Sequence, residues 1–465
     1  MARDAVQTSP RGLRTRAWAY ACVVLAAVLL YLPSFRHGFI GYDDTLLVVD
    51  DAAFLSDPGN ALQAFRRDAF DIPGYRSSGA YYRPVLTLSL MLDAQIGGTS
   101  PWIYHVSNVL QHAAASALLL AFLTALGTGL PGALAAALLF AAHPALAGVV
   151  SWVPGRVDAL LALFLLASAL GGLSYLRKGG WGGAALHLAG YALAAFTKEI
   201  GVLLPIPLTL WALAEPQAGR RRLLRLAPAW GAILVAWFLL REAALTRSGV
   251  AADLLSNVGS NLIVLVHYIG KTFVPAFLSV APTLADTPVY PGLIAAAALA
   301  VALARSRSRN RARVVLGAAW FLTFALPPLL VPRVVGLEQR LYAPMAGLLI
   351  LLLEAGAAAA VERRRWARWA SAAVILVFAA LTLQRQPVFG DRLRFWENAV
   401  ASSPHSSYAR ASLGAIYLAR GRVDEARAHY QRAVELNPAE PKANLNLGVI
   451  AGRAGRTREA QEHFR

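Results

Sequence analysis

Long apolar runs recur along the first 385 residues of this 465-residue chain, and short polar stretches separate them. A run of roughly 17–25 apolar residues can cross the bilayer as a helix, because a helix satisfies all of its own backbone hydrogen bonds. The pattern predicts an all-α, polytopic membrane helix bundle. Its eleven expected spans lie near residues 17–33, 104–126, 130–147, 156–176, 182–197, 199–214, 222–241, 290–304, 314–331, 341–360 and 367–384.

The C-terminal region follows a different pattern, a repeat with a period of 34 residues. Leu413-Gly414 recurs as Leu447-Gly448, Gly421 as Gly455, Glu425-Ala426 as Glu459-Ala460, and Tyr430 as Phe464. This period and these residue types are typical of tetratricopeptide repeats, which form an α-solenoid of helix pairs. The expected domains are a membrane domain at 1–386, with its first external loop at 34–103, and a repeat region at 387–465. The repeat region divides into a half-repeat at 387–408, a repeat at 409–442 and a partial repeat at 443–465.

The repeat array is short, since solenoids usually need about three repeats and polar caps. We expect either a truncated gene product or repeats that pack on the membrane body.

Charge decides between two interpretations of the strongly basic composition. The net charge of +18 is typical of nucleic-acid binding, but the positive residues gather between apolar spans. Such clusters mark cytoplasmic loops, so we expect a bilayer and no nucleic acid as the partner. The clusters are Arg177-Lys178, Arg220-Arg221-Arg222, Arg305 to Arg313, and Arg363-Arg364-Arg365.

The same clusters predict the topology. The N-terminus is expected inside and, with eleven spans, the repeats outside the cytoplasm. A cleaved signal peptide is the competing interpretation of the first span, but no small-x-small cleavage site follows it. Residues 253–275 are expected to form an interfacial or re-entrant helix on the outer face, since a further span would misplace the basic run at 305–313. The Ala-, Arg- and Leu-rich usage indicates a bacterial inner membrane, with the repeats in the periplasm.

Polar residues stand where apolar spans meet the expected outer loops. The long first loop is acidic and begins with the pair Asp43-Asp44. If the spans bundle, these side chains converge on one outward-facing cavity, and ionisable groups at such depth are candidates for function. The remaining candidates are Tyr82, Arg83, His105, His143, Arg156, Asp158, Lys198, Glu199, Glu338, Arg340 and Tyr342.

Structural roles compete with each of these assignments. Asp43-Asp44 can cap a helix that begins near Thr45, and Arg340 can simply pair with Glu338. Lys198-Glu199 can be a solvated turn, and His143-Pro144 is a common end to a helix.

The order of motifs resembles a known family. The run from Phe39 to Asp44 resembles the acidic first-loop motif of the GT-C superfamily of polytopic glycosyltransferases. The whole series looks like the transmembrane and tetratricopeptide-repeat-containing O-mannosyltransferases. It continues through Tyr82-Arg83-Pro84-Val85, Asp93, Tyr104-His105, His143-Pro144, Trp152, Gly155-Arg156, Asp158, Lys198-Glu199 and Arg340-Leu341-Tyr342, and ends in the repeats. One departure is Gly148, where the family usually carries a Glu.

The resemblance implies an inverting transferase that moves mannose from a polyprenyl-phosphate carrier to Ser or Thr of exported protein. An acceptor hydroxyl needs a base, and Asp43 is the preferred candidate, with Asp44 orienting it or binding the acceptor; the reverse order stays open. A leaving phosphate needs cations, and the candidates are Arg83, Arg156, Lys198 and Arg340. The other motif residues are expected to bind substrate, and the repeats to hold the acceptor polypeptide.

A divalent metal stays an open alternative, because carboxylates with waters bind Mg²⁺ or Mn²⁺. The sequence shows no recognisable metal site, however, so we do not predict a metal, and no cofactor is certain. Other functions stay open. A GT-C transferase can act on a glycolipid or glycan, and a membrane-anchored tetratricopeptide scaffold has no reaction at all. A transporter is expected to show internal symmetry, which we do not find.

Overall fold

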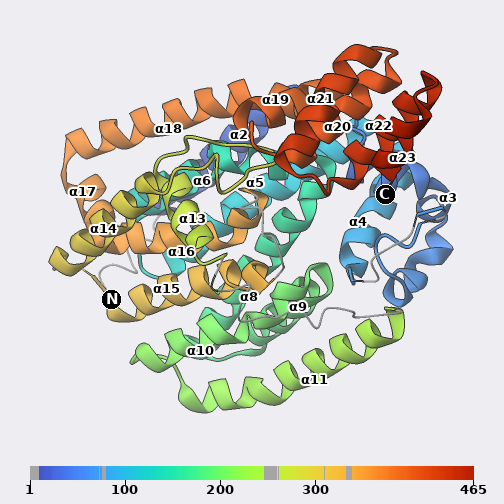
Figure 1. Ribbon diagram of the computed structural model, residues 1–465. Coiled ribbons are helices and arrows are strands. Elements are labelled where there is room, and N and C mark those ends of the chain that lie inside the picture. The colour runs from blue at the N-terminus through green and yellow to red at the C-terminus, as the bar shows by residue number, and fades with distance from the viewer. Residues whose placement is uncertain are drawn as a thin grey trace.

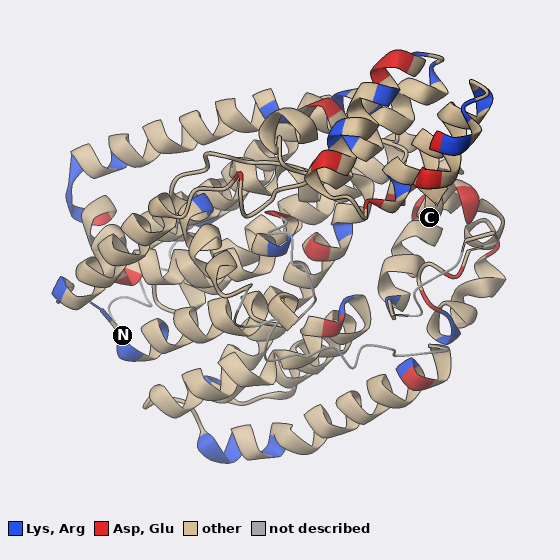
Figure 2. Ribbon diagram, viewed as in Figure 1, with Lys and Arg blue, Asp and Glu red and all other residues tan. Residues whose placement is uncertain are grey.

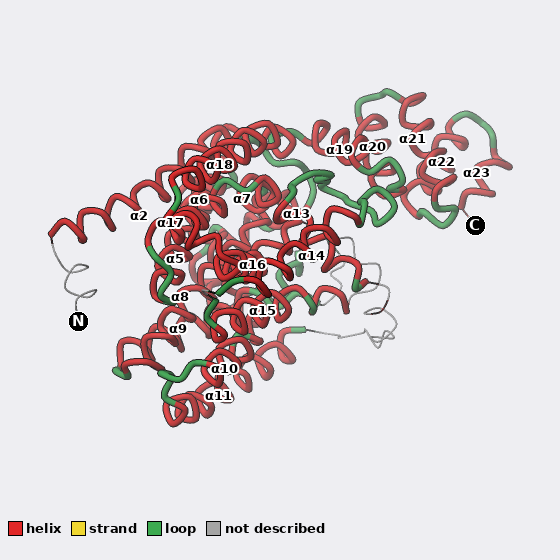
Figure 3. The backbone as a smooth tube through the Cα atoms, turned by 90° about the vertical axis from the view of Figure 1, so that its left-hand side faces the viewer, coloured by secondary structure: helices red, strands yellow, loops and turns green. Residues whose placement is uncertain are grey.

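The computed structural model describes residues 10–72, 74–75, 80–245, 259, 261–307, 309–330 and 338–464. Within these ranges the regular structure is helical, without strands (Figures 1 and 3), which confirms the predicted all-α class. The larger helices of the membrane body are α2 (Pro10–Tyr31), α5 (Pro101–Ala125), α6 (Leu130–Ala141), α8 (Arg156–Lys178), α9 (Trp181–Thr197), α10 (Pro205–Ala214), α11 (Arg220–Ala244), α14 (Tyr290–Arg305), α15 (Arg311–Ala325), α16 (Tyr342–Leu352) and α18 (Arg365–Arg385).

Every one of the eleven expected spans contains a helix. In the described part of the chain, seven helices are long and apolar enough to cross a membrane, and a bent pair makes an eighth. The other three expected spans hold the shorter helices α9, the segment Glu199–Ala214, and α14. The protein is therefore an integral membrane protein, and the count of eleven stays a prediction.

The expected span at 130–147 is not one straight helix. Helix α6 ends at Ala141, and the chain turns by 46° at His143-Pro144 before α7 (Ala147–Ser151). Pro144 causes the break, because proline lacks an N–H and disfavours helical geometry in the residue before it. The His143 ring stabilises the turn, since its Nδ1 accepts from the Ala145 amide at 3.2 Å.

The segment expected to lie at the outer interface is described only in part. Asp253 and Asn257 fall outside the described residues, while α13 spans Ile263–Phe273. Eleven residues are fewer than a transmembrane helix needs. Gly270 packs tightly on α14, because an added Cβ would lie 2.8 Å from the Gly292 nitrogen. Its position at the membrane surface stays a prediction.

Two helical segments lie within the first external loop. The 3-10 segment Pro58–Arg66 and α4 (Pro84–Gly97) lie between α2 and α5. Between them and α2 the chain forms the π-helical segment Thr45–Asp50 and α3 (Ala52–Leu55).

The C-terminal helices form the predicted tetratricopeptide solenoid. They are α19 (Arg392–Ser402), α20 (Ser407–Ala419), α21 (Val423–Leu436), α22 (Pro441–Arg453) and α23 (Thr457–Phe464). The recurring glycines allow the paired helices to pack closely. A Cβ on Gly414 would lie 2.9 Å from the Tyr430 ring, and Gly448 meets the ring of Phe464 in the same way.

The solenoid packs on the membrane body, one of the two arrangements expected for a short array. Figure 1 shows its red helices against the first-loop region at one end of the bundle. Phe389, Phe395 and Trp396 share a buried apolar cluster with Ile40 of the first loop and Trp152. The Gly38 amide also donates to the Gly390 carbonyl at 3.4 Å.

The basic clusters lie at the opposite end of the bundle. Figure 2 shows blue segments at the ends of α14, α18 and α11 that lie far from the solenoid. This separation agrees with the arrangement expected from the positive-inside rule. Which side is the cytoplasm stays a prediction.

Candidate active site

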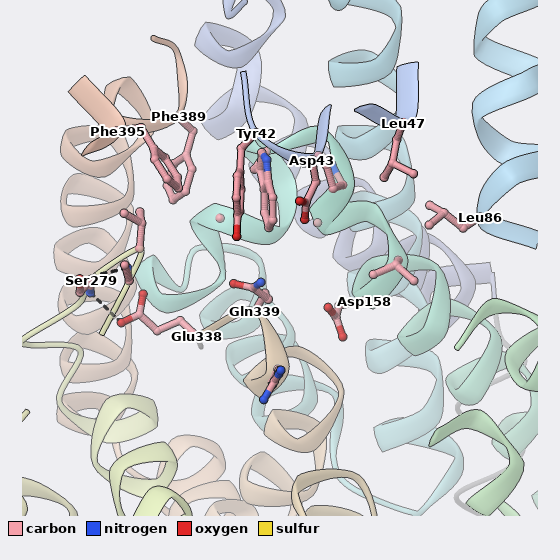
Figure 4. Close-up of a pocket in the computed structure, with 18 of the residues that line it drawn as sticks. Tyr42, Asp43, Leu47, Leu86, Asp158, Ser279, Glu338, Gln339, Phe389 and Phe395 are labelled. Carbon is pink, nitrogen blue, oxygen red and sulfur yellow. Dashed lines mark hydrogen bonds between the residues drawn. The ribbon is translucent and has the colours of Figure 1, made fainter. Parts of the chain in front are cut away.

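A cavity of about 450 Å³ opens where the first loop, the ends of several spans and the first tetratricopeptide helices meet. Figure 4 shows Tyr42 and Asp43 projecting into it from the first loop, with Asp158, Gln339 and Glu338 across the space. Its charged lining is Asp43, Arg83, Asp158, Lys198, Glu338, Arg340 and Arg385. Six of these seven residues are among the predicted site residues.

The adjacent carboxylates Asp43 and Asp44 have different surroundings. Asp44 is 1% exposed, and it accepts hydrogen bonds from the amides of Ile40 at 2.6 Å, Tyr42 at 2.9 Å and Thr45 at 2.9 Å. It therefore holds the loop in shape and caps the helical segment that follows. Asp43 makes no such bonds with the described residues and lines the cavity. The capping alternative applies to Asp44 alone.

The electrostatic surroundings of Asp43 favour proton uptake. Burial raises its pKa to about 6, the charge of Asp44 adds to the rise, and Arg83 opposes it. A carboxylate that titrates near neutral pH can take a proton from a hydroxyl more readily than an ordinary Asp.

Arg340 supplies an uncommitted cation. Its side chain makes no ion pair with the described residues, and its Nη1 is buried without a hydrogen-bond partner among them. A buried N–H that lacks a partner is costly. An anionic oxygen in the cavity would satisfy this donor, and a guanidinium suits the geometry of a phosphate.

Glu338 forms ion pairs with Lys271 and Arg385 and none with its neighbour Arg340. Its Oε1 accepts from Lys271 Nζ at 2.8 Å and from the Ser279 amide at 2.8 Å, and its Oε2 accepts from Arg385 Nη2 at 2.5 Å. Glu338 is 4% exposed. The alternative in which Arg340 merely neutralises Glu338 is therefore wrong.

Two further ion pairs stand at the cavity wall. Lys198 Nζ lies 2.5 Å from Asp158 Oδ1, so the turn residue Lys198 is paired rather than solvated. Arg83 lies 3.6 Å from Glu199 and 4.7 Å from the Tyr81 ring centre. Asp158, Lys198 and Arg83 line the cavity, whereas Glu199 is not part of the lining.

Other predicted residues lie outside the cavity lining and have structural partners. Arg156 is fully buried, and it donates to Asp93 at 2.6 Å and to the Tyr104 carbonyl at 2.9 Å. Its role as a phosphate ligand is not supported, because its guanidinium is already bound. The remaining four also have partners. The Tyr82 hydroxyl donates to the Phe65 carbonyl, and the His105 ring packs on His37. His143 forms a hydrogen bond with the Thr272 carbonyl, and Tyr342 forms one with His112.

Arg156→Met is expected to act through stability. Removing one partner of a buried ion pair costs about 3–5 kcal/mol, because Asp93 is left buried and unpaired. Thermal unfolding in detergent measures this loss. The double variant Arg156→Met/Asp93→Leu should recover much of the stability. A folded Arg156→Met protein that binds donor phosphate weakly would instead place Arg156 in the binding site.

Sequence reasoning missed several lining residues. Arg385 lies at the polar end of the last span, and Ser279 lies in the loop after α13. The aromatic residues Trp396 and Tyr408 come from the repeat region. The only local signal for Arg385 was a cation at the end of an apolar run. Among the described residues, no three His, Cys, Asp or Glu gather where they could hold a metal ion.

Comparisons with known proteins agree with the motifs. A family model described as TPR repeat matches residues 414–455. Mouse protein O-mannosyl-transferase TMTC2 is 46% identical over 90 residues, which are 19% of this chain and 11% of that protein. Drosophila melanogaster protein O-mannosyl-transferase Tmtc2 is 36% identical over 163 residues, 34% of this chain and 17% of that protein. ArnT from Cupriavidus metallidurans, solved with undecaprenyl phosphate bound, is 16% identical with a TM-score of 0.48, over 93% of this chain and 80% of that chain.

The resemblance to the transmembrane and tetratricopeptide-containing O-mannosyltransferases is confirmed by the repeat model and by the matches to the two transferases. The chain spans less than a fifth of the length of the two named transferases. The similarity thus covers a part of those proteins.

Proposed function

We propose that this protein is a membrane glycosyltransferase of the GT-C type that moves a sugar, with mannose as the first candidate, from a polyprenyl-phosphate carrier to Ser or Thr hydroxyls of polypeptides. The motif order and the names of the relatives support the class. The observation that carries the proposal is a single cavity with Asp43 on one wall and Arg340, whose buried N–H lacks a partner among the described residues, also in its lining.

Asp43 acts as the general base. The acceptor hydroxyl loses its proton to the Asp43 carboxylate as its oxygen bonds to C1 of the sugar, and the bond from C1 to the phosphate oxygen breaks. Attack on the face opposite the leaving phosphate inverts the configuration at C1. Positioned proton transfer of this kind contributes typically about 10²–10⁴-fold to a rate. Asp44 keeps the loop in the conformation that presents Asp43.

Arg340 receives the departing phosphate, with Arg83 and Lys198 as neighbouring cations. A guanidinium grips phosphate oxygens with two parallel hydrogen bonds and stabilises charge as it develops. Arg83 and Lys198 already have carboxylate partners. They therefore attract the phosphate mainly through their positive electrostatic field and less through direct hydrogen bonds. The apolar grooves between spans hold the prenyl tail.

The acceptor approaches from the solenoid side, since α19 and α20 contribute Phe395, Trp396 and Tyr408 to the cavity. We place the repeats in the bacterial periplasm and the N-terminus in the cytoplasm. A glycolipid acceptor and a purely structural scaffold are the competing functions.

The deciding experiment follows radiolabelled sugar from polyprenyl-phosphate mannose in membranes that contain the wild type, Asp43→Asn or the matched variant Asp50→Asn, which alters an exposed residue of the same loop. The product is separated into protein and lipid fractions. We expect label in protein with the wild type and Asp50→Asn only. Label in the lipid fraction would indicate a glycolipid acceptor. If neither fraction is labelled with this or other prenyl-linked sugars, the non-enzymatic scaffold is the function that remains.

A further inference from the structure

At the cavity the first loop meets the tetratricopeptide helices through Tyr42 and Tyr408, and two cations lie beside these residues. We call the four residues the seam: Tyr42, Arg392, Tyr408 and Lys442. Tyr408 Oη donates to Tyr42 Oη at 3.1 Å, and both rings line the cavity. Tyr42 directly precedes Asp43, so the seam starts beside the proposed base. It continues outward, because Lys442 Nζ lies 5.5 Å from the centre of the Tyr408 ring.

Large aromatic side chains fix the position of the seam. The Tyr42 ring stacks on Trp152 with 6.0 Å between ring centres, and it meets Trp396 edge-on at 5.7 Å. Trp396 in turn contacts Tyr408 at 5.5 Å. Aromatic pairs of this geometry add about 0.5–1.5 kcal/mol each beyond area burial. The solenoid therefore forms one wall of the reaction site.

Arg392 of α19 covers the loop backbone next to Tyr42. Gly41 has a φ of +68°, and an added Cβ there would lie 2.8 Å from Arg392 Cδ. The position favours glycine for both reasons. The stem of Arg392 therefore lies over the loop that presents Asp43, and its side chain is exposed.

The two seam cations have no carboxylate within 4 Å among the residues that the structure describes, and Lys442 Nζ donates to Ser412 Oγ at 3.5 Å. Neither Arg392 nor Lys442 makes an ion pair with any of them. The two nearest carboxylates in the sequence are held by neutral donors and keep their charge: Asp391 accepts from the amides that begin α19, and Glu440 accepts from Ser407 Oγ at 2.9 Å. Burial lowers the pKa of Lys442, Glu440 opposes the shift and Arg392 adds to it.

We propose that the seam is the acceptor subsite and that it selects extended polypeptides with acidic side chains near the modified Ser or Thr. This rests on the proposed transferase function. The rings of Tyr42 and Tyr408, joined through their hydroxyl groups, offer aromatic contacts to an extended chain, and Arg392 and Lys442 attract its carboxylates. A hydroxyl held beside Tyr42 lies next to Asp43.

Binding is measured on the purified full chain by fluorescence anisotropy, independently of transfer. Three labelled peptides share one Ser or Thr and differ in flanks of Asp and Glu, of Gly and Ala, or of Lys. We expect the acidic peptide to bind about tenfold more tightly than the basic one, as two exposed ion pairs allow. The preference should shrink at high salt. Arg392→Glu and Lys442→Glu together should reverse it.

Matched variants separate this effect from misfolding. Arg432→Glu reverses a charge on the neighbouring helix α21, where Arg432 pairs with Glu435 at 2.7 Å, and should leave the preference unchanged. The neutral Lys442→Gln and Arg392→Gln should each lower the preference about threefold. Equal binding of the three peptides, or a preference that survives the double reversal, would overturn the subsite.

Transfer to the same peptides is measured in parallel. Charge-selective binding without transfer would keep the seam as a peptide site and reject the transferase function. Transfer without charge selectivity would reject the seam and keep the transferase. Label in lipid alone, with no peptide bound, would overturn the seam and polypeptide acceptor together.

Discussion

Replacing Asp43 by Asn is expected to lower kcat for sugar transfer by about 10²–10⁴-fold, the range that a positioned base contributes. The side chain keeps its size and cavity position, but it can no longer take the acceptor proton. Initial rates with saturating donor and acceptor measure the effect, and donor affinity should change little. Asp50→Asn is the matched control in the same loop. A variant that retains more than a tenth of the wild-type rate would exclude Asp43 as the base.

The neighbouring substitution separates catalysis from loop structure. Asp44→Ala removes the acceptor of three backbone amides, and leaving the buried Ile40 amide unpaired alone costs about 1–3 kcal/mol. We expect a less stable protein. Asp43→Asn should instead be at least as stable as the wild type near neutral pH. The pKa of Asp43 is raised to about 6 in the folded protein, so its ionised form disfavours folding above that pH.

The raised pKa of Asp43 also predicts a pH profile. The base must be ionised, so kcat/KM should rise about tenfold per pH unit below about 6 and level off above it. The residual activity of Asp43→Asn should lack this limb. The profile is measured with one donor and one acceptor whose own groups do not titrate in this range. A rising limb that persists in Asp43→Asn would assign the titration to another group.

Replacing Arg340 by Met is expected to reduce kcat/KM by about 10²–10³-fold, the loss usually seen when one charge-stabilising donor is removed from an active site. The reason is that the buried Nη1 of Arg340 lacks a partner among the described residues, whereas Arg83, Lys198 and Arg385 have carboxylates within 4 Å. Inhibition by polyprenyl phosphate should weaken in parallel. The kcat/KM of Arg340→Lys should lie between those of the wild type and Arg340→Met, because lysine keeps the positive charge but lacks the planar, two-pronged guanidinium.

The control for Arg340 is Arg305→Met, at the exposed end of α14 in a basic loop. It should leave both kcat/KM and inhibition unchanged. If Arg340→Met behaves like this control while Arg385→Met loses activity, the phosphate lies on the Glu338 side of the cavity instead.

The helices and the repeats were predictable because their signals are local. Each apolar run is long enough to form a helix by itself, and all eleven expected spans contain one. The 34-residue period similarly predicted paired helices, and the structure adds that their recurring glycines meet an aromatic ring. The bend at His143-Pro144 was less predictable, since hydrophobicity continues through it and only the proline marks the break.

The candidate site was predictable only as a set of residue types. Asp43 and Asp44 are adjacent and chemically identical. Nevertheless, three backbone amides donate to Asp44, whereas Asp43 lines the cavity. Arg156 and Arg340 stand in equally suggestive motifs. The buried Asp93 neutralises Arg156. Glu338, the partner expected for Arg340, is instead paired with Lys271 and Arg385.

The sequence by itself determined that this chain is a helical membrane protein with tetratricopeptide repeats, because span length and repeat period depend on neighbouring residues. Only the tertiary structure decided which charges lack a partner among the described residues and that Trp396 and Tyr408 of the repeats line the cavity. The physical reason is that burial and pairing depend on contacts between residues far apart in the chain, such as Glu338 with Lys271 and Tyr42 with Tyr408.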